Sequence, residues 1–167
     1  MRQQQLFPTS ELPTTDHLVN VASVPQRSPF RYPGGKTWLV PVFRRWLASL
    51  PTAPDLLIET FAGGAIIGLT AACEKLTGHV ILVELDADVA AVWKTVLCGD
   101  AEWLASRIVR FELSTASLQN ELASPAQTAR AHAFHTILRN RTAHGGILAD
   151  GAGVIKTGEG GRGLASR

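Results

Sequence analysis

Residues 55–68 read DLLIETFAGGAIIG, and this stretch decides the fold class that we predict. Its first part, Asp55 to Glu59, is a short apolar run, which is typical of a buried strand. Gly63 and Gly64 then form a tight turn, and the apolar residues after them predict a helix over 65–76. A strand that enters a helix through a glycine turn is the first half of a parallel α/β unit.

The neighbouring segments extend this unit in both directions. HVILVEL, residues 79–85, predicts a second buried strand, and ADVAAVWKTVL, residues 87–97, predicts an amphipathic helix. Residues 100–139 have a mostly helical pattern with a break near Ser124. A helix is also predicted over 37–49, with four apolar residues spaced to share one face: Trp38, Val42, Trp46 and Leu50.

The composition is that of a globular chain with one domain. The 167 residues are 46% hydrophobic and 18% charged, and the net charge of +2 permits a nucleic-acid partner without arguing for one. Cys73 and Cys98 belong to no C-x-x-C pattern, and neither a signal peptide nor a membrane span is recognisable. We therefore expect a reduced, cytoplasmic setting and no membrane partner.

Three regions differ in character along the chain. Residues 1–28 are rich in Gln, Thr, Ser and Pro, which predicts a flexible leader that packs little. The folded core is expected over 29–139. Residues 140–167 hold eight of the fifteen glycines, with several basic residues among them. This tail is expected to build no core by itself, and to be either a disordered end or a loop-rich surface that orders on an extended polyanion.

An acidic residue closes each of the two predicted strands, and a ligand is expected where parallel strands end. Gly63, Ala65 and Gly68 form an imperfect G-x-G-x-x-G, with Glu84 following 21 residues after Gly63, which would suit the ribose of a dinucleotide. S-adenosylmethionine also needs an acid on the second strand, and its cationic groups would be attracted by Glu59, which would repel a pyrophosphate. Electrostatics therefore favours the methyl donor.

A second glycine pair lies upstream, in FRYPGGKTW, residues 30–38. Its centre is similar to the end of a nucleotide-binding P-loop, but Phe30 stands where that loop requires its first glycine. The polar, proline-bearing residues before it also do not read as the strand that precedes a P-loop. We therefore do not expect a P-loop at these glycines.

Three stretches in order, PFRYPGGK, ETFAGGA and VELDADVAAVW, resemble the first motifs of the D12 (Dam-like) DNA adenine methyltransferases. The resemblance covers 29–167 and implies a three-layer, Rossmann-like α/β fold that is incomplete at its C-terminal side. It implies methyl transfer from S-adenosylmethionine to the exocyclic amino group of adenine. One difference is Ala65, where the family has glycine. The implied cofactor-binding residues are Tyr32, Pro33, Gly34, Gly35, Lys36, Glu59, Phe61, Gly63, Gly64 and Glu84.

The sequence after Thr136 is similar to the segment that opens the family's target-recognition part. The residues expected to contact double-stranded DNA are Asn140, Arg141, Lys156 and Arg162. The family's chemistry depends on an Asp-Pro-Pro-Tyr-like tetrapeptide, but the 167 residues contain no Pro-Pro, and Tyr32 is the only tyrosine. We therefore assign no catalytic residue and expect this chain alone to be inactive. DLLIE is expected to be an open strand edge that could pair with a complementing chain.

Two other interpretations remain open. The chain could be a non-catalytic fragment or partner subunit that binds S-adenosylmethionine or DNA and needs another chain for chemistry. It could also be a nicotinamide-dependent oxidoreductase, although an acid such as Glu59 is rare before the glycines of that fold. His132 and His135 have a helical spacing that could suit a metal, but no third ligand is near in sequence, so we predict no metal site.

Overall fold

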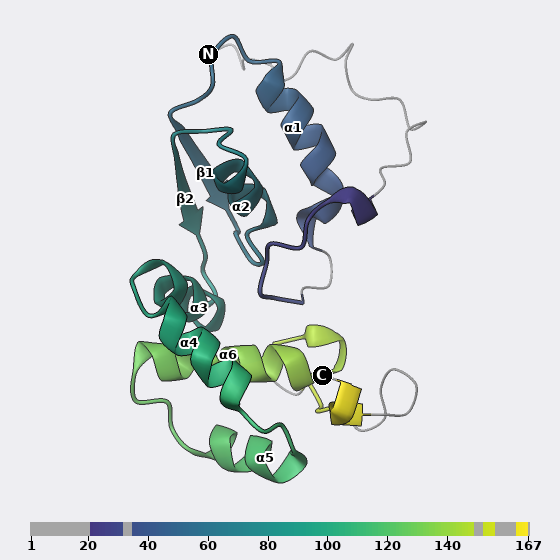
Figure 1. The fold of residues 1–167 in the computed structure, drawn as a ribbon, viewed down its shortest axis with the longest axis vertical. Coiled ribbons are helices and arrows are strands. Elements are labelled where there is room, and N and C mark those ends of the chain that lie inside the picture. The colour runs from purple at the N-terminus through teal and green to yellow at the C-terminus, as the bar shows by residue number, and fades with distance from the viewer. Residues whose placement is uncertain (1–20, 32–34, 149–151, 156–162, 167) are drawn as a thin grey trace, which may run out of the picture.

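The computed structural model describes residues 21–31, 35–148, 152–155 and 163–166. An α/β part and a helical part lie one above the other (Figure 1). The α/β part contains α1 Val40–Ala48, β1 Leu56–Thr60, α2 Ile66–Cys73 and β2 His79–Val83. The helical part contains α3 Ala87–Leu97, α4 Ala101–Arg110, α5 Thr115–Ala123 and α6 Ala129–Thr142. The 3₁₀ turns are η1 Val21–Ser23, η2 Lys36–Leu39, η3 His144–Gly146 and η4 Gly163–Ser166.

The two strands form a parallel pair, in register from Leu56 opposite His79 to Thr60 opposite Val83. This confirms the predicted mixed α/β class with parallel strands. The helix α2 follows β1 and packs on one face of the pair, and α1 packs against α2. None of the helices in the described part of the chain has the length and apolar character needed to cross a bilayer.

The other face of the sheet is not covered by the described residues. Leu56, Ile58, Ile81 and Val83 alternate with the covered positions, and each has between 46% and 53% of its surface exposed. Parallel sheets normally have helices on both faces. The described residues therefore form two layers here and not the three layers that we predicted.

The helix α1 buries a different face from the predicted one. Val40, Phe43 and Leu47 are buried, whereas Trp38 is 59% exposed and Trp46 is 39% exposed. The chain enters α1 through the 3₁₀ turn η2, so a single helical period cannot be extended back to Trp38. The prediction assumed one continuous helix, and this moved the apolar stripe to the wrong side.

The first and last segments also pack more than predicted. Val24 is buried in the cluster around α1 and α2, and Phe30 is buried against the ring of Trp93. Near the other end, Ile155 is buried and its N–H donates to the carbonyl of Thr142. The predicted leader is therefore part of the fold from residue 21 onward, and residues 1–20 lie outside the described residues.

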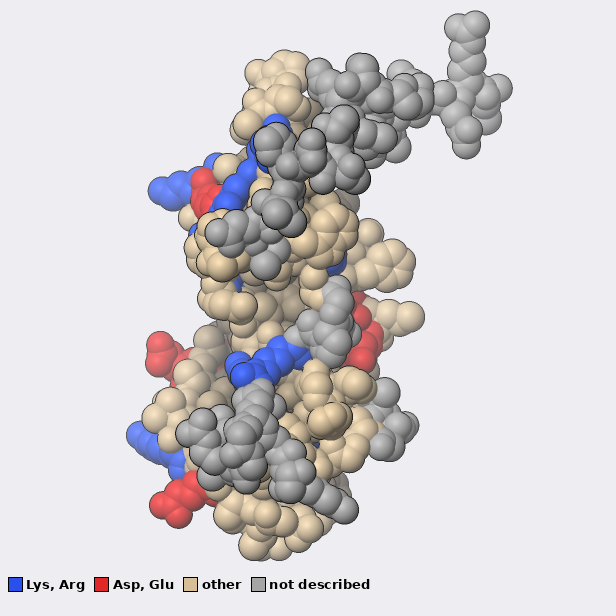
Figure 2. Space-filling model, turned by 90° about the vertical axis from the view of Figure 1, so that its right-hand side faces the viewer, with Lys and Arg blue, Asp and Glu red and all other residues tan. Residues whose placement is uncertain are grey.

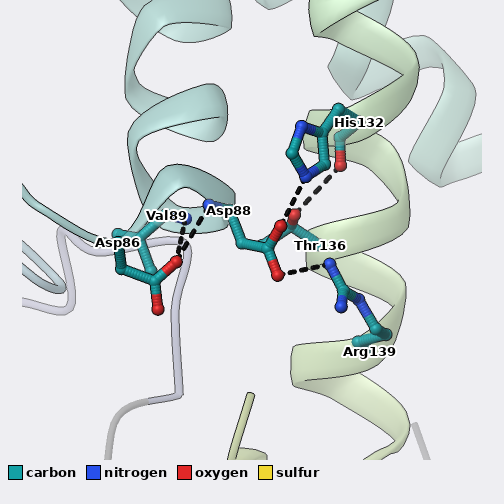
Figure 3. A network of polar contacts seen from close by, with 6 residues as sticks. All are labelled: Asp86, Asp88, Val89, His132, Thr136 and Arg139. Atoms are coloured by element: carbon teal, nitrogen blue, oxygen red, sulfur yellow. Dashed lines mark hydrogen bonds and ion pairs between the residues drawn. The ribbon is translucent and has the colours of Figure 1, made fainter. Parts of the chain in front are cut away.

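One carboxylate joins α3 to α6. Asp88, in the first turn of α3, points toward α6, where His132 contacts one of its oxygens and Arg139 lies 2.6 Å from the other (Figure 3). Asp86 caps the start of α3 by accepting from the N–H groups of Asp88 and Val89. This cap holds Asp88 in place at the contact between the two helices.

A second ion-pair cluster predicts a pH dependence of stability. The hydrogen bond from Arg44 is the main reason that the pKa of Glu74 lies below its ordinary value, with burial opposing it and Arg27 adding to it. The stabilisation is present above the ordinary glutamate pKa of about 4.3 and is lost as the pH falls through the lower pKa of the folded state. Glu74→Gln is expected to be less stable than the natural chain by about 1 kcal/mol at pH 7.

This prediction is checked by urea unfolding of both proteins between pH 3 and pH 7. The stability difference between them should shrink as the pH falls below about 4, because both proteins then carry a neutral side chain at this position. A difference that stays constant over the whole range would show that Glu74 contributes through packing and not through its charge.

Candidate functional site

An open cleft with a volume of about 790 Å³ lies at the carboxyl end of β1. It is lined by residues of 26–37, by the turn 60–66 and by Arg141. The face in Figure 2 shows Lys and Arg side chains gathered at mid-height, between the α/β part and the helical part. None of the described residues that line the cleft is acidic.

The turn between β1 and α2 adopts a strained backbone. Phe61, Gly63 and Ala65 have φ values of 55°, 52° and 50°, which is the left-handed region that favours glycine. Ala65 is not a glycine, so its methyl group is held in this region at a cost of about 1 kcal/mol. Phe61 is 83% exposed and lines the cleft. Backbone strain of this kind persists where neighbouring contacts hold it in place.

Glu84 supplies one of those contacts. Its Oε2 accepts from the N–H of Gly63 at 2.6 Å, and its Oε1 accepts from the N–H of Asp86 at 2.9 Å. Trp93 holds the same turn from the other side, because its indole N–H donates to the carbonyl of Gly63 at 2.8 Å. The glycine turn and the acid of the second strand therefore come together, although Glu84 itself does not line the cleft. The sequence analysis gave Trp93 no role, because nothing in the spacing of the sequence links it to Gly63.

Glu59 has a different surrounding from the one we expected. Its side chain is only 4% exposed, its Oε2 accepts from the N–H of Gly68 at 2.7 Å, and its Oε1 lies 2.8 Å from Nζ of Lys36. The ion pair is close, but it lacks the direction of a hydrogen bond, so Oε1 has no hydrogen-bond partner. Lys36 Nζ instead donates to the carbonyl of Phe61 at 2.7 Å.

This geometry corrects the argument from charge. Glu59 is buried behind the cleft wall and its charge is balanced by Lys36, so it neither meets a ligand directly nor repels a phosphate strongly. The interpretation that Glu59 attracts the cationic end of the cofactor is therefore wrong for this conformation. The reason is that the sequence analysis placed Lys36 against the ligand and did not pair it with Glu59.

Asn140 also has another role. It has no exposed surface; its Oδ1 accepts from the N–H of Arg31 at 2.9 Å, and its Nδ2 donates at 2.8 Å to the carbonyls of Arg31 and Gly146. A side chain with no exposed surface cannot contact DNA, so that prediction is wrong for Asn140. It connects α6 and η3 to the segment that leads into the cleft.

Arg141 lies beside it and reaches the cleft wall. Its guanidinium donates to the carbonyl of Pro29 at 2.8 Å. The pKa of Arg141 is lowered mainly by burial and, to a smaller extent, by the positive charge of Arg31. Arg31 was missed by the sequence analysis although it lies in the quoted motif, because an isolated arginine carries no spacing signal. The other predicted residues, Tyr32, Pro33, Gly34, Lys156 and Arg162, lie outside the described residues.

No protein-family model matches this chain, and no curated protein or solved structure matches it either. A function can therefore be argued only from the residues themselves and from the way the fold brings them together at the cleft.

Proposed function

We propose that this chain binds S-adenosylmethionine in the cleft, as the cofactor-binding part of an adenine-specific DNA methyltransferase with a Rossmann-like fold. The observation that supports this is the meeting of motifs that are far apart in sequence. Gly35 and Lys36 from the first motif line the same cleft as residues 61–65 from the second. The acid of the third motif, Glu84, is hydrogen-bonded to Gly63 at the back of that turn.

Glu84 retains the capacity to bind a ribose. A carboxylate offers about four lone-pair sites, and the two N–H groups described above occupy two of them. Because Glu84 stands outside the lining of the cleft, this role requires that the ribose extends out of the cleft along the turn, where its two hydroxyl groups would use the remaining sites. A carboxylate that is already oriented by backbone N–H groups loses little side-chain entropy when it accepts these further bonds.

The proposal also includes double-stranded DNA as the substrate and a cytoplasmic location. It further includes a complementing chain that supplies the catalytic tetrapeptide. The basic residues at the cleft are the described feature that fits a polyanion. The same residues would also fit the phosphates of a dinucleotide. NAD is therefore the comparison ligand that decides between the two cofactor classes.

Calorimetry with S-adenosylmethionine, S-adenosylhomocysteine and NAD tests the proposal. The natural chain should bind the first two and should bind NAD more weakly. Glu84→Ala should lose about 1.5 to 3 kcal/mol of S-adenosylmethionine binding, because the ribose hydroxyls lose a charged acceptor. Glu102→Ala, an exposed glutamate on α4, is the matched control and should bind as the natural chain does.

Two outcomes would contradict the proposal. Tighter binding of NAD than of S-adenosylmethionine would assign the cleft to a dinucleotide. An unchanged affinity in Glu84→Ala would show that this carboxylate only holds the turn. Thermal unfolding of Glu84→Ala should accompany the calorimetry, since the variant also loses two hydrogen bonds to the backbone.

A further inference from the structure

Arg141 carries a charge that no described carboxylate balances. Its one hydrogen bond in the structure goes to a neutral acceptor, the carbonyl of Pro29, and no described acid lies within ion-pair distance of it. Its neighbours at the cleft are themselves basic, Arg31 and Lys36, and Lys36 is already paired with Glu59. A partly buried cation without a counter-ion is costly, and an anion in the cleft would remove that cost.

The start of α2 also offers donors to the cleft. Gly64 and Ile66 are among the lining residues, and their N–H groups have no hydrogen-bond partner among the described residues. The neighbouring N–H groups of Gly63 and Gly68 are already taken by Glu84 and Glu59. An anion bound in the cleft therefore has both a guanidinium and free backbone amides among the residues that line it.

We propose that Arg141 is a ligand-binding residue that holds the carboxylate of the amino-acid part of S-adenosylmethionine. This proposal rests on the proposed function, and it moves Arg141 from the DNA surface to the cofactor cleft. A guanidinium binds a carboxylate with two parallel hydrogen bonds, which a neutral side chain cannot reproduce. The cleft consequently selects ligands that keep this carboxylate.

The surroundings of Arg141 favour a small anionic group over the DNA backbone. Arg141 is partly buried at the cleft wall, where its guanidinium donates to the carbonyl of Pro29, and burial lowers its pKa. Asn140, the residue before it, is fixed by three hydrogen bonds to main-chain atoms. Asn140 is thus the positioning residue, because it sets the end of α6 from which Arg141 reaches the cleft.

The test compares S-adenosylmethionine with decarboxylated S-adenosylmethionine, which keeps the sulfonium and the amine but lacks the carboxylate. Both are titrated into the natural chain and into three variants, Arg141→Gln, Arg141→Lys and Arg45→Gln. Arg45 is an exposed arginine on α1, so its variant serves as the control. The natural chain and Arg45→Gln should prefer the carboxylate-bearing ligand by at least about tenfold. Arg141→Gln should lose this preference, while its affinity for the decarboxylated ligand stays within about twofold of that of the natural chain. Arg141→Lys should keep part of the preference.

The contrary outcomes are distinct from one another. An equal loss for both ligands in Arg141→Gln and in Arg141→Lys would assign Arg141 a structural role and overturn this proposal. An unchanged preference for the carboxylate-bearing ligand in Arg141→Gln would also overturn it. Binding of duplex DNA is measured in parallel with the same variants, and a loss of affinity for DNA alone would overturn the proposal as well. If the natural chain binds neither ligand, the proposed function fails and this inference fails with it.

Discussion

Replacing Asn140 by alanine is expected to lower the free energy of unfolding by about 3 to 5 kcal/mol. The side chain makes three hydrogen bonds, all to main-chain atoms of Arg31 and Gly146. It has no exposed surface, so water cannot replace these bonds without opening the structure. Each buried donor or acceptor that loses its partner costs about 1 to 3 kcal/mol, which makes this one of the most sensitive positions in the chain.

Chemical denaturation of the purified variant measures this effect. Asn120→Ala is the matched control, because Asn120 is exposed on α5 and its replacement should change stability by no more than about 0.5 kcal/mol. Asn140→Ala should also weaken ligand binding, since Arg31 and Arg141 both depend on this contact. A loss of less than about 1 kcal/mol would contradict the hydrogen-bond network described here.

Gly146→Ala is expected to lower the free energy of unfolding by about 2 to 4 kcal/mol. Gly146 has a φ of 73°, and an added Cβ would lie 2.6 Å from the carbonyl oxygen of Arg31. That oxygen belongs to the backbone and already accepts from Asn140, so it cannot move aside like the end of a side chain. The smaller backbone entropy of alanine in the unfolded chain offsets only about 0.4 to 1 kcal/mol of this cost.

Gly153→Ala is the matched control for this variant. An added Cβ at Gly153 would meet no atom within 4 Å, so its stability should be close to that of the natural chain. The double variant of Asn140 and Gly146 should lose less than the sum of the two single losses, because both changes disrupt the same contact with Arg31. Strict additivity would show that the two residues act on separate parts of the fold.

Much of the fold could be predicted where the pattern is local. The helix over 87–97 was predicted with its observed bounds, and both strands were predicted to within two residues at each end. The helix after the glycine turn was predicted from 65 and is observed from Ile66. The spacing of apolar residues and the position of turn residues determine where such helices and strands begin and end, and both can be read from a short stretch of sequence.

The candidate site could be predicted only in part. The sequence indicated that the glycine turn and Glu84 lie together, because the carboxyl ends of parallel strands meet at one edge. It did not indicate that Lys36 pairs with Glu59, or that Asn140 is buried between Arg31 and Gly146. Lys36 and Glu59 are separated by 23 residues, and Arg31 and Asn140 by 109 residues, and no local pattern links either pair.

The sequence by itself determined the parallel α/β unit, its glycine turn and the acids that close its strands, because these depend on spacing within about 30 residues. Only the tertiary structure decided which charges are already balanced and which face the cleft. Glu59 is the penultimate residue of β1 and Glu84 follows the last residue of β2, yet one is buried against Lys36 and the other holds Gly63. The physical reason is that the effect of a charge depends on its burial and its partners, and both are set by chain segments that meet only when the protein folds.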